Sequence, residues 1–117
     1  MSFILPKGQH RFTNVHVLDE PGAGGAYHEY DIRLIKDGTT VATVNFQKGP
    51  VKEDGENGIF LEDLLSICQH RLECFQAGDF ACRENALALT KIQEALHWLN
   101  HRTADRQARN VEGLNQK

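Results

Sequence analysis

The spacing of apolar residues changes from a period of two to a helical period near the middle of the chain. Before residue 47, apolar side chains alternate with polar ones, and after residue 58 they recur every three or four positions. Alternation is typical of half-buried strands, and three-to-four spacing is typical of amphipathic helices. Because the strands precede the helices instead of alternating with them, the chain is predicted to have an α+β fold.

The first half is predicted to form an N-terminal antiparallel β meander. Its strands are expected at Arg11–Val17, Tyr27–Ile35 and Thr40–Phe46, and a short additional strand within residues 2–5 is left open. Asp37 and Gly38 lie between two of these runs, within residues 36–39, where an Asp-Gly pair indicates a β-hairpin because type I′ turns need positive φ angles. The glycine-rich residues 21–25 are predicted to be a flexible turn or loop.

The second half is predicted to form a long C-terminal helical hairpin. A connecting loop and two helices are expected at residues 47–58, 59–76 and 81–109. Glu62 and Asp63 lie in the first turn of the first helix, where the dipole favours anions, and Gly78 follows the end of that helix. The short linker requires antiparallel helices. The second helix has one apolar stripe that must be covered, made of Ala88, Leu89, Ile92, Ala95, Leu96 and Leu99.

The length of the chain, 117 residues, suits one domain and is too short for two independent cores. A single domain over 1–117 is therefore expected, with a β region over 1–50 and the helical hairpin over 59–110. Two helix faces and one small sheet provide a modest core. Association between copies is expected to cover the remaining apolar surface.

The totals exclude several classes of protein. A net charge of -3 and a pI near 6 argue against binding to nucleic-acid polymers. No run reaches the roughly 18 apolar residues of a membrane span, and the N-terminus lacks the apolar core of a secretory leader, so a cytoplasmic protein is expected. The three cysteines, Cys68, Cys74 and Cys82, have neither metal nor disulfide spacing and are expected to be reduced thiols packed as small hydrophobes.

Motifs for catalysis are not found. The sequence contains no GxSxG, no P-loop, no GxGxxG and no pair of carboxylates placed as acid and base. His97 and His101 have the i, i+4 spacing of a helical metal chelate, but Trp98 stands where a zincin has glutamate and no third ligand is suggested. A binding protein with no metal and no cofactor is therefore expected, and not an enzyme.

Three arginines, Arg102, Arg106 and Arg109, are spaced i, i+4, i+7 near the end of the second predicted helix. Two interpretations of these arginines are open. Cations favour the last turns of a helix, and Asp105 is spaced to pair with Arg102 and Arg109. Alternatively, the guanidinium groups form an anion clamp, because they present forks of donors that suit phosphate and planes that stack on bases.

Aromatic and amide side chains extend this second interpretation. Phe75, Phe80 and Trp98 are expected in one region of the hairpin, where they would offer a nucleotide base a stacking surface. For Phe80 and Trp98, core packing is favoured over contact with a ligand. Asn85 is able to bind a base edge or a ribose, but at the start of a helix it is first expected to act as a cap.

Several motifs together resemble the phage-encoded Thoeris anti-defense protein 1 family. They are FQKGPVKEDGENG, LEDLL, RLECFQAGDFACRENALALTKIQEALHWL and RTADRQARNVEG, in this order along the C-terminal two thirds of the chain. The resemblance implies a protein made during infection that acts in the cytoplasm of the bacterial host. Such proteins are sponges: they bind glycocyclic ADP-ribose, a cyclic ADP-ribose isomer that signals infection, without cleaving it.

The resemblance also implies roles for residues at matching positions. Phe75 and Arg102 correspond to the pair that sandwiches the adenine, and Asn85 and Arg106 to contacts with ribose and phosphates. Weaker correspondences, to further ligand contacts, are Thr103 and Arg109. Family members are homodimers, in which each pocket combines one chain's helices with its neighbour's β region, and some are hexamers built as trimers of dimers.

The alternative function is a sponge for CBASS cyclic di- or trinucleotides, at a separate site in a hexamer. Ala77 stands where several members carry the lysine associated with that site, which weakens this alternative. Asp79 and Asn110 depart from a proline and a glycine that are common in the family.

Overall fold

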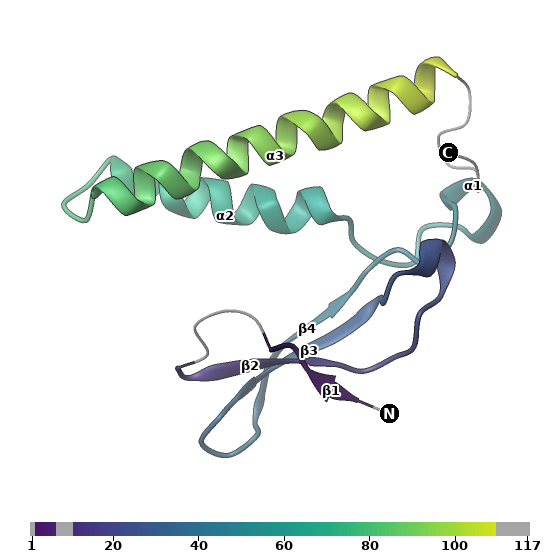
Figure 1. Cartoon of the computed structure of the whole chain (residues 1–117), viewed down its shortest axis with the longest axis horizontal. Coiled ribbons are helices and arrows are strands. Elements are labelled where there is room, and N and C mark those ends of the chain that lie inside the picture. Colours follow the sequence, from purple (N-terminus) through teal and green to yellow (C-terminus); the bar gives the residue numbers. More distant parts are fainter. Residues whose placement is uncertain (1, 7–10, 110–117) are drawn as a thin grey trace. The chain divides into compact units, whose positions relative to one another are not determined.

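The computed structural model describes residues 2–6 and 11–109, and Asn110 lies outside the described part. The chain forms two compact units, Met1–Ile59 and Phe60–Lys117 (Figure 1). The elements are β1 (Phe3–Ile4), β2 (Thr13–Val17), the 3-10 helix η1 (Ala23–Gly25), β3 (Glu29–Leu34), β4 (Thr40–Asn45), α1 (Val51–Asp54), α2 (Leu61–Gln76) and α3 (Arg83–Ala108). The predicted α+β fold, a β meander followed by a long helical hairpin, is confirmed. The single domain stays a prediction.

The first unit is an antiparallel sheet in which the strands lie in their order along the chain, β1-β2-β3-β4. The short strand left open within residues 2–5 forms and pairs Phe3 with Val17. Across the sheet Val17 lies opposite Tyr30, which lies opposite Val44. This row shares one face, and Val17 is 1% exposed. Among the described residues, it is the one fully buried apolar side chain, so the core of a single copy is small.

The opposite face of the sheet is polar and is organised around Asp31. The Asp31 carboxylate accepts hydrogen bonds from Nη2 of Arg33 and from the hydroxyl of Thr43, both at 2.8 Å. These two side chains, Arg33 first and then Thr43, lower the pKa of Asp31 below its ordinary value against the opposing effect of burial. Asp31 therefore stays ionised although it is only 9% exposed.

The hairpin predicted at Asp37 and Gly38 is confirmed, because β3 and β4 pair antiparallel. Its connection spans residues 35–39. The backbone N–H of Thr39 donates to the Asp37 carboxylate at 2.9 Å, and Gly38 has a φ of 77° that only glycine adopts freely. The glycine-rich run at 21–25 contains the 3-10 helix η1.

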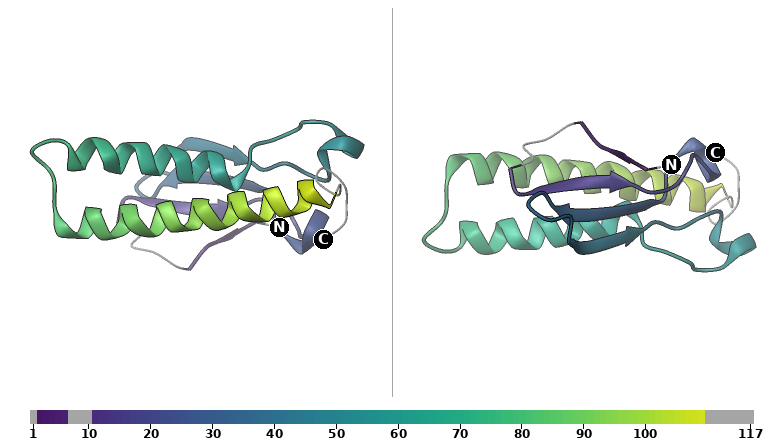
Figure 2. Two further views of the ribbon diagram at one scale, coloured as in Figure 1. Left: turned by 90° about the horizontal axis from the view of Figure 1, so that it is seen from above. Right: turned by 90° about the horizontal axis from the view of Figure 1, so that it is seen from below.

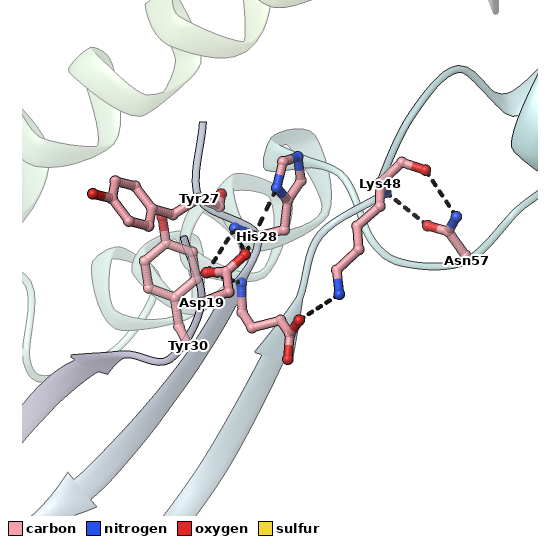
Figure 3. Close-up of polar contacts among 7 residues, drawn as sticks. Asp19, Tyr27, His28, Tyr30, Lys48 and Asn57 are labelled. Carbon is pink, nitrogen blue, oxygen red and sulfur yellow. Dashed lines mark hydrogen bonds and ion pairs between the residues drawn. The ribbon is translucent and has the colours of Figure 1, made fainter. Parts of the chain in front are cut away.

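The connecting segment at 47–58 is more ordered than a loop, because it contains helix α1 and is held by two side-chain amides. Gln47 donates to the carbonyls of Gly49 and Gly55, at 3.1 and 2.6 Å, and accepts from the backbone of Asn57 at 2.9 Å. The Asn57 amide exchanges two hydrogen bonds with the backbone of Lys48, at 2.7 and 2.9 Å (Figure 3). The segment is therefore fixed by its own side chains.

The segment that leads into β3 is fixed by a carboxylate. The Asp19 side chain accepts hydrogen bonds from the backbone N–H groups of His28 and Glu29, at 3.0 and 3.2 Å, and lies 3.9 Å from Nδ1 of His28 (Figure 3). Lys48 pairs with the Glu29 carboxylate beside it. These contacts join the start of β3 to the segments before and after it.

In the second unit, α2 and α3 run antiparallel and side by side, as all three views show (Figures 1 and 2). Their half-buried residues follow three-to-four spacing: Glu62, Leu64, Leu65, Gln69, Leu72, Phe75 and Gln76 on α2, and Asn85, Leu89, Ile92, Ala95, Leu96, Leu99, Thr103 and Arg106 on α3. We call this set the seam. Neither helix has a fully buried residue within its described range.

The helix ends confirm some predictions and correct others. Glu62 and Asp63 occupy the first turn of α2 as predicted, and the Asp63 carboxylate accepts from the backbone of Phe60 at 2.9 Å. At α3 the cap is Cys82, whose Sγ accepts from the backbone N–H of Asn85 at 3.4 Å. The expectation that Asn85 caps α3 is therefore wrong, and its amide side chain is not used as a cap.

Gly58 lies at a close approach between two backbone segments. Phe46 and Ile59 form a parallel bridge, and a Cβ on Gly58 would lie 2.5 Å from the carbonyl carbon of Phe46. Gly58→Ala is expected to lower the free energy of unfolding by about 2–4 kcal/mol, because backbone must move. Gly22→Ala is the control, since its Cβ would meet His28 at an ordinary 3.6 Å. Equal urea midpoints for Gly58→Ala and Gly22→Ala would contradict the predicted clash at Gly58.

The pKa of Asp19 is lowered from its usual 3.8: burial raises it, and the N–H groups of Glu29 and His28 together lower it by more. Such a group stabilises the fold above its unfolded pKa, and this contribution is lost as the pH falls through the folded pKa. Asp19→Asn is therefore expected to be less stable than wild type at pH 7, with a smaller difference below pH 3.8.

The measurement is urea unfolding at pH 7 and below pH 3.8. The control variant is Glu20→Gln, which changes the exposed residue next to Asp19. A difference between Asp19→Asn and wild type that does not change with pH would show that the Asp19 charge is not involved.

Candidate functional site

The arginines predicted from the sequence lie together on the last turns of α3, at the end of the hairpin that is opposite the α2–α3 connection. We call Arg102, Thr103, Arg106 and Arg109 the arginine cluster. Arg106 and Thr103 are half-buried on the seam, and Arg102 and Arg109 are exposed. The cluster therefore combines two half-buried positions with two exposed ones.

Arg102 and Arg109 each lie beside a carboxylate. Nη2 of Arg102 lies 3.7 Å from Oε2 of Glu62, and Nε of Arg109 lies 3.1 Å from Oδ2 of Asp105. The predicted pairing of Asp105 is therefore confirmed for Arg109. For Arg102 the structure gives a different partner, which comes from the other helix.

The second group of predicted site residues lies at the connection between the helices. Phe75 is the penultimate residue of α2, and Asn85 is in the first turn of α3. Both are half-buried. The guanidinium carbon of Arg71 lies 5.0 Å from the centre of the Phe75 ring, so this aromatic face already has a cationic neighbour.

One chain does not bring the two groups together. Phe75 lies 13 positions after Glu62, the partner of Arg102, which corresponds to about 20 Å of helix. Asn85 lies 17 positions before Arg102, or about 25 Å. A single adenine ring therefore cannot contact Phe75 and Arg102 of the same hairpin.

The aromatic residues do not share one region as expected. Phe80 lies in the connection between α2 and α3 and is 77% exposed. The prediction that Phe80 packs in the core is therefore wrong. Trp98 lies one turn before Arg102 and is 64% exposed, which contradicts core packing there too. The rings of His97 and His101 contact the Trp98 ring edge-on, at centroid distances of 5.2 and 5.8 Å.

The cysteines are free, as predicted, but they are exposed and not packed as small hydrophobes. Cys82 caps α3 as described above. Sγ of Cys74 lies 3.7 Å from Nε2 of His70, one helical turn away. The apolar faces expected to bury these thiols are open in a single copy of the chain.

Two contacts were missed by sequence reasoning. Glu62 was considered only for its effect on the helix dipole, and Arg71 was not considered at all. The i, i+4 spacing of Arg71 and Phe75 is visible in the sequence and predicts their contact. The pair of Glu62 with Arg102 depends on the register of two helices, which spacing along one helix does not give.

No described helix is both long enough and apolar enough to cross a membrane. The described part of the chain is an α+β protein whose helical hairpin carries a cluster of arginines at one end and an aromatic side chain with an amide at the other. The class of protein is therefore an α+β protein with an arginine-bearing helical hairpin.

The chain belongs to the Acb2/Tad1 hairpin domain family, whose model matches residues 39–104. The family predicted from the sequence motifs is thereby confirmed. A relative is Thoeris anti-defense 1 of Bacillus phage SBSphiJ7, which is 57% identical over 77 residues. The alignment covers 66% of this chain and 54% of the relative, so this chain matches about half of the relative's length.

Proposed function

We propose that this chain is a phage anti-defense protein that counters Thoeris by binding and sequestering its signal, a cyclic ADP-ribose isomer, without cleaving it. The observation that carries the proposal is the arginine cluster at the end of α3. Family membership and the name of the Bacillus phage relative support a role against Thoeris. The host cytoplasm is where such a signal would be intercepted.

The chemistry of the ligand suits the side chains. A cyclic ADP-ribose isomer carries an adenine base and a pyrophosphate. Guanidinium groups donate to phosphate oxygens in pairs, and stacking of a base on an aromatic ring contributes about 1–3 kcal/mol. A sponge must compete with the host effector, which requires nanomolar binding, about -12 kcal/mol. Binding of this strength needs no catalytic group, and the proposed protein is not an enzyme.

We propose that the pocket is shared between two copies. Phe75 and Arg102 of one hairpin are separated by about 20 Å along α2. In a two-fold dimer, the connection end of one hairpin lies beside the arginine end of its partner, and two equivalent pockets result. The open apolar side chains of Ile67, Leu87 and Trp98, which are 64%, 48% and 64% exposed, provide surface for this dimer or for a larger assembly such as a trimer of dimers.

The first prediction concerns the fate of the ligand. After incubation with purified protein, glycocyclic ADP-ribose is expected to leave the free pool and to return unchanged when the protein is denatured, at one molecule per pocket, as measured by chromatography. Recovery of a converted product would show that the protein is an enzyme. A parallel incubation with a cyclic trinucleotide tests the alternative ligand, and its retention would contradict the inference from Ala77.

The second prediction concerns the shared pocket. Phe75→Ala and Arg102→Ala are each expected to abolish most binding while the helices stay folded, because both side chains are partly exposed. Co-expression of the two variants should restore about a quarter of the wild-type binding capacity, since half of the randomly formed two-fold dimers are mixed and each mixed dimer has one intact pocket.

Calorimetric titration of the co-purified variants measures this capacity, and each variant alone is the control. If both residues acted within one chain, no mixed dimer would contain an intact pocket. Absence of any recovery in a sample shown to contain mixed dimers would therefore contradict the shared pocket.

A further inference from the structure

The carboxylate of Glu62 holds Arg102 at the arginine end of the hairpin. The ion pair crosses between the first turn of α2 and the C-terminal part of α3, with 3.7 Å between Oε2 and Nη2. The Glu62 side chain is 26% exposed, whereas the Arg102 side chain is 56% exposed. Glu62 is therefore the half-buried partner, and Arg102 is the exposed partner.

A carboxylate beside an anion-binding site repels the ligand phosphates. Two features of Glu62 explain how it can occupy this position. Its place in the first turn of α2 stabilises its negative charge through the helix dipole. In addition, a guanidinium donates hydrogen bonds from its edges and stacks through its faces, so a carboxylate at one edge leaves both faces open.

We propose that Glu62 is a positioning residue, which holds the edge of the Arg102 guanidinium so that its face meets the adenine of the bound nucleotide. This inference rests on the proposed function and deepens it. The long arginine side chain loses rotamer freedom when it binds. An arginine that is already held by Glu62 loses less of this freedom when the ligand arrives.

A double-mutant cycle tests this role. Glu62→Gln is expected to weaken the binding of glycocyclic ADP-ribose about threefold to tenfold in the wild-type background, and to have no effect in the Arg102→Lys background, where a cation remains but no planar guanidinium face has to be positioned. Glu62→Asp keeps the charge and is expected to recover part of the loss. The matched control is Glu94→Gln, which removes the same charge from an exposed ion pair with Lys91 on the same unit.

Calorimetry gives the affinities, and far-UV circular dichroism confirms that each variant is helical. A loss of equal size with and without Arg102 would show that Glu62 acts only on the fold and would overturn the inference. Tighter binding by Glu62→Gln would overturn it as well, because repulsion would then be the dominant effect. If the wild-type protein does not bind the ligand, the proposed function itself fails. This outcome is distinguishable from failure of the inference about Glu62, because it is seen before any variants are compared.

Discussion

The antiparallel pairing of α2 with α3 along the seam determines where every candidate ligand contact lies. Because the helices run in opposite directions, the end of α2 meets the beginning of α3, and the beginning of α2 meets the arginine cluster. Candidate ligand contacts that lie within 35 positions of one another in the sequence are therefore placed at opposite ends of the hairpin. The separation between these two groups of candidate contacts follows from the directions of the two helices alone.

The seam alone is a weak source of stability. Its side chains are only half-buried, and at both ends it changes from leucine to polar residues such as Gln76 and Arg106. The hydrophobic contribution grows with the apolar area removed from water, so half-buried side chains contribute much less than a filled core would. Ile67 and Trp98 leave further apolar surface exposed outside the seam. This balance favours a protein that completes its packing by association.

The fold could be predicted from the sequence to a greater extent than the candidate site. Periodicity gave the strands and both long helices, because it depends on one element at a time. The length of the turn after Leu34 and the order in residues 47–58 depend on side-chain hydrogen bonds, such as those of Gln47, which no periodic pattern encodes. The arginine cluster was visible as spacing, but its separation from Phe75 and the pairing of Arg102 with Glu62 required the register of two helices.

Arg102 and Arg109 differ in how firmly each is held by its carboxylate. Arg109 and Asp105 are both exposed and lie one turn apart on one helix, and such pairs contribute only about 0.3–0.5 kcal/mol. Arg109 can therefore leave its partner for a ligand phosphate at little cost. Arg102 is paired across helices with a half-buried carboxylate, so its position is tied to the packing of the hairpin. A net charge of -3 is compatible with this cluster, since the carboxylates of Glu62 and Asp105 lower the local repulsion between arginines.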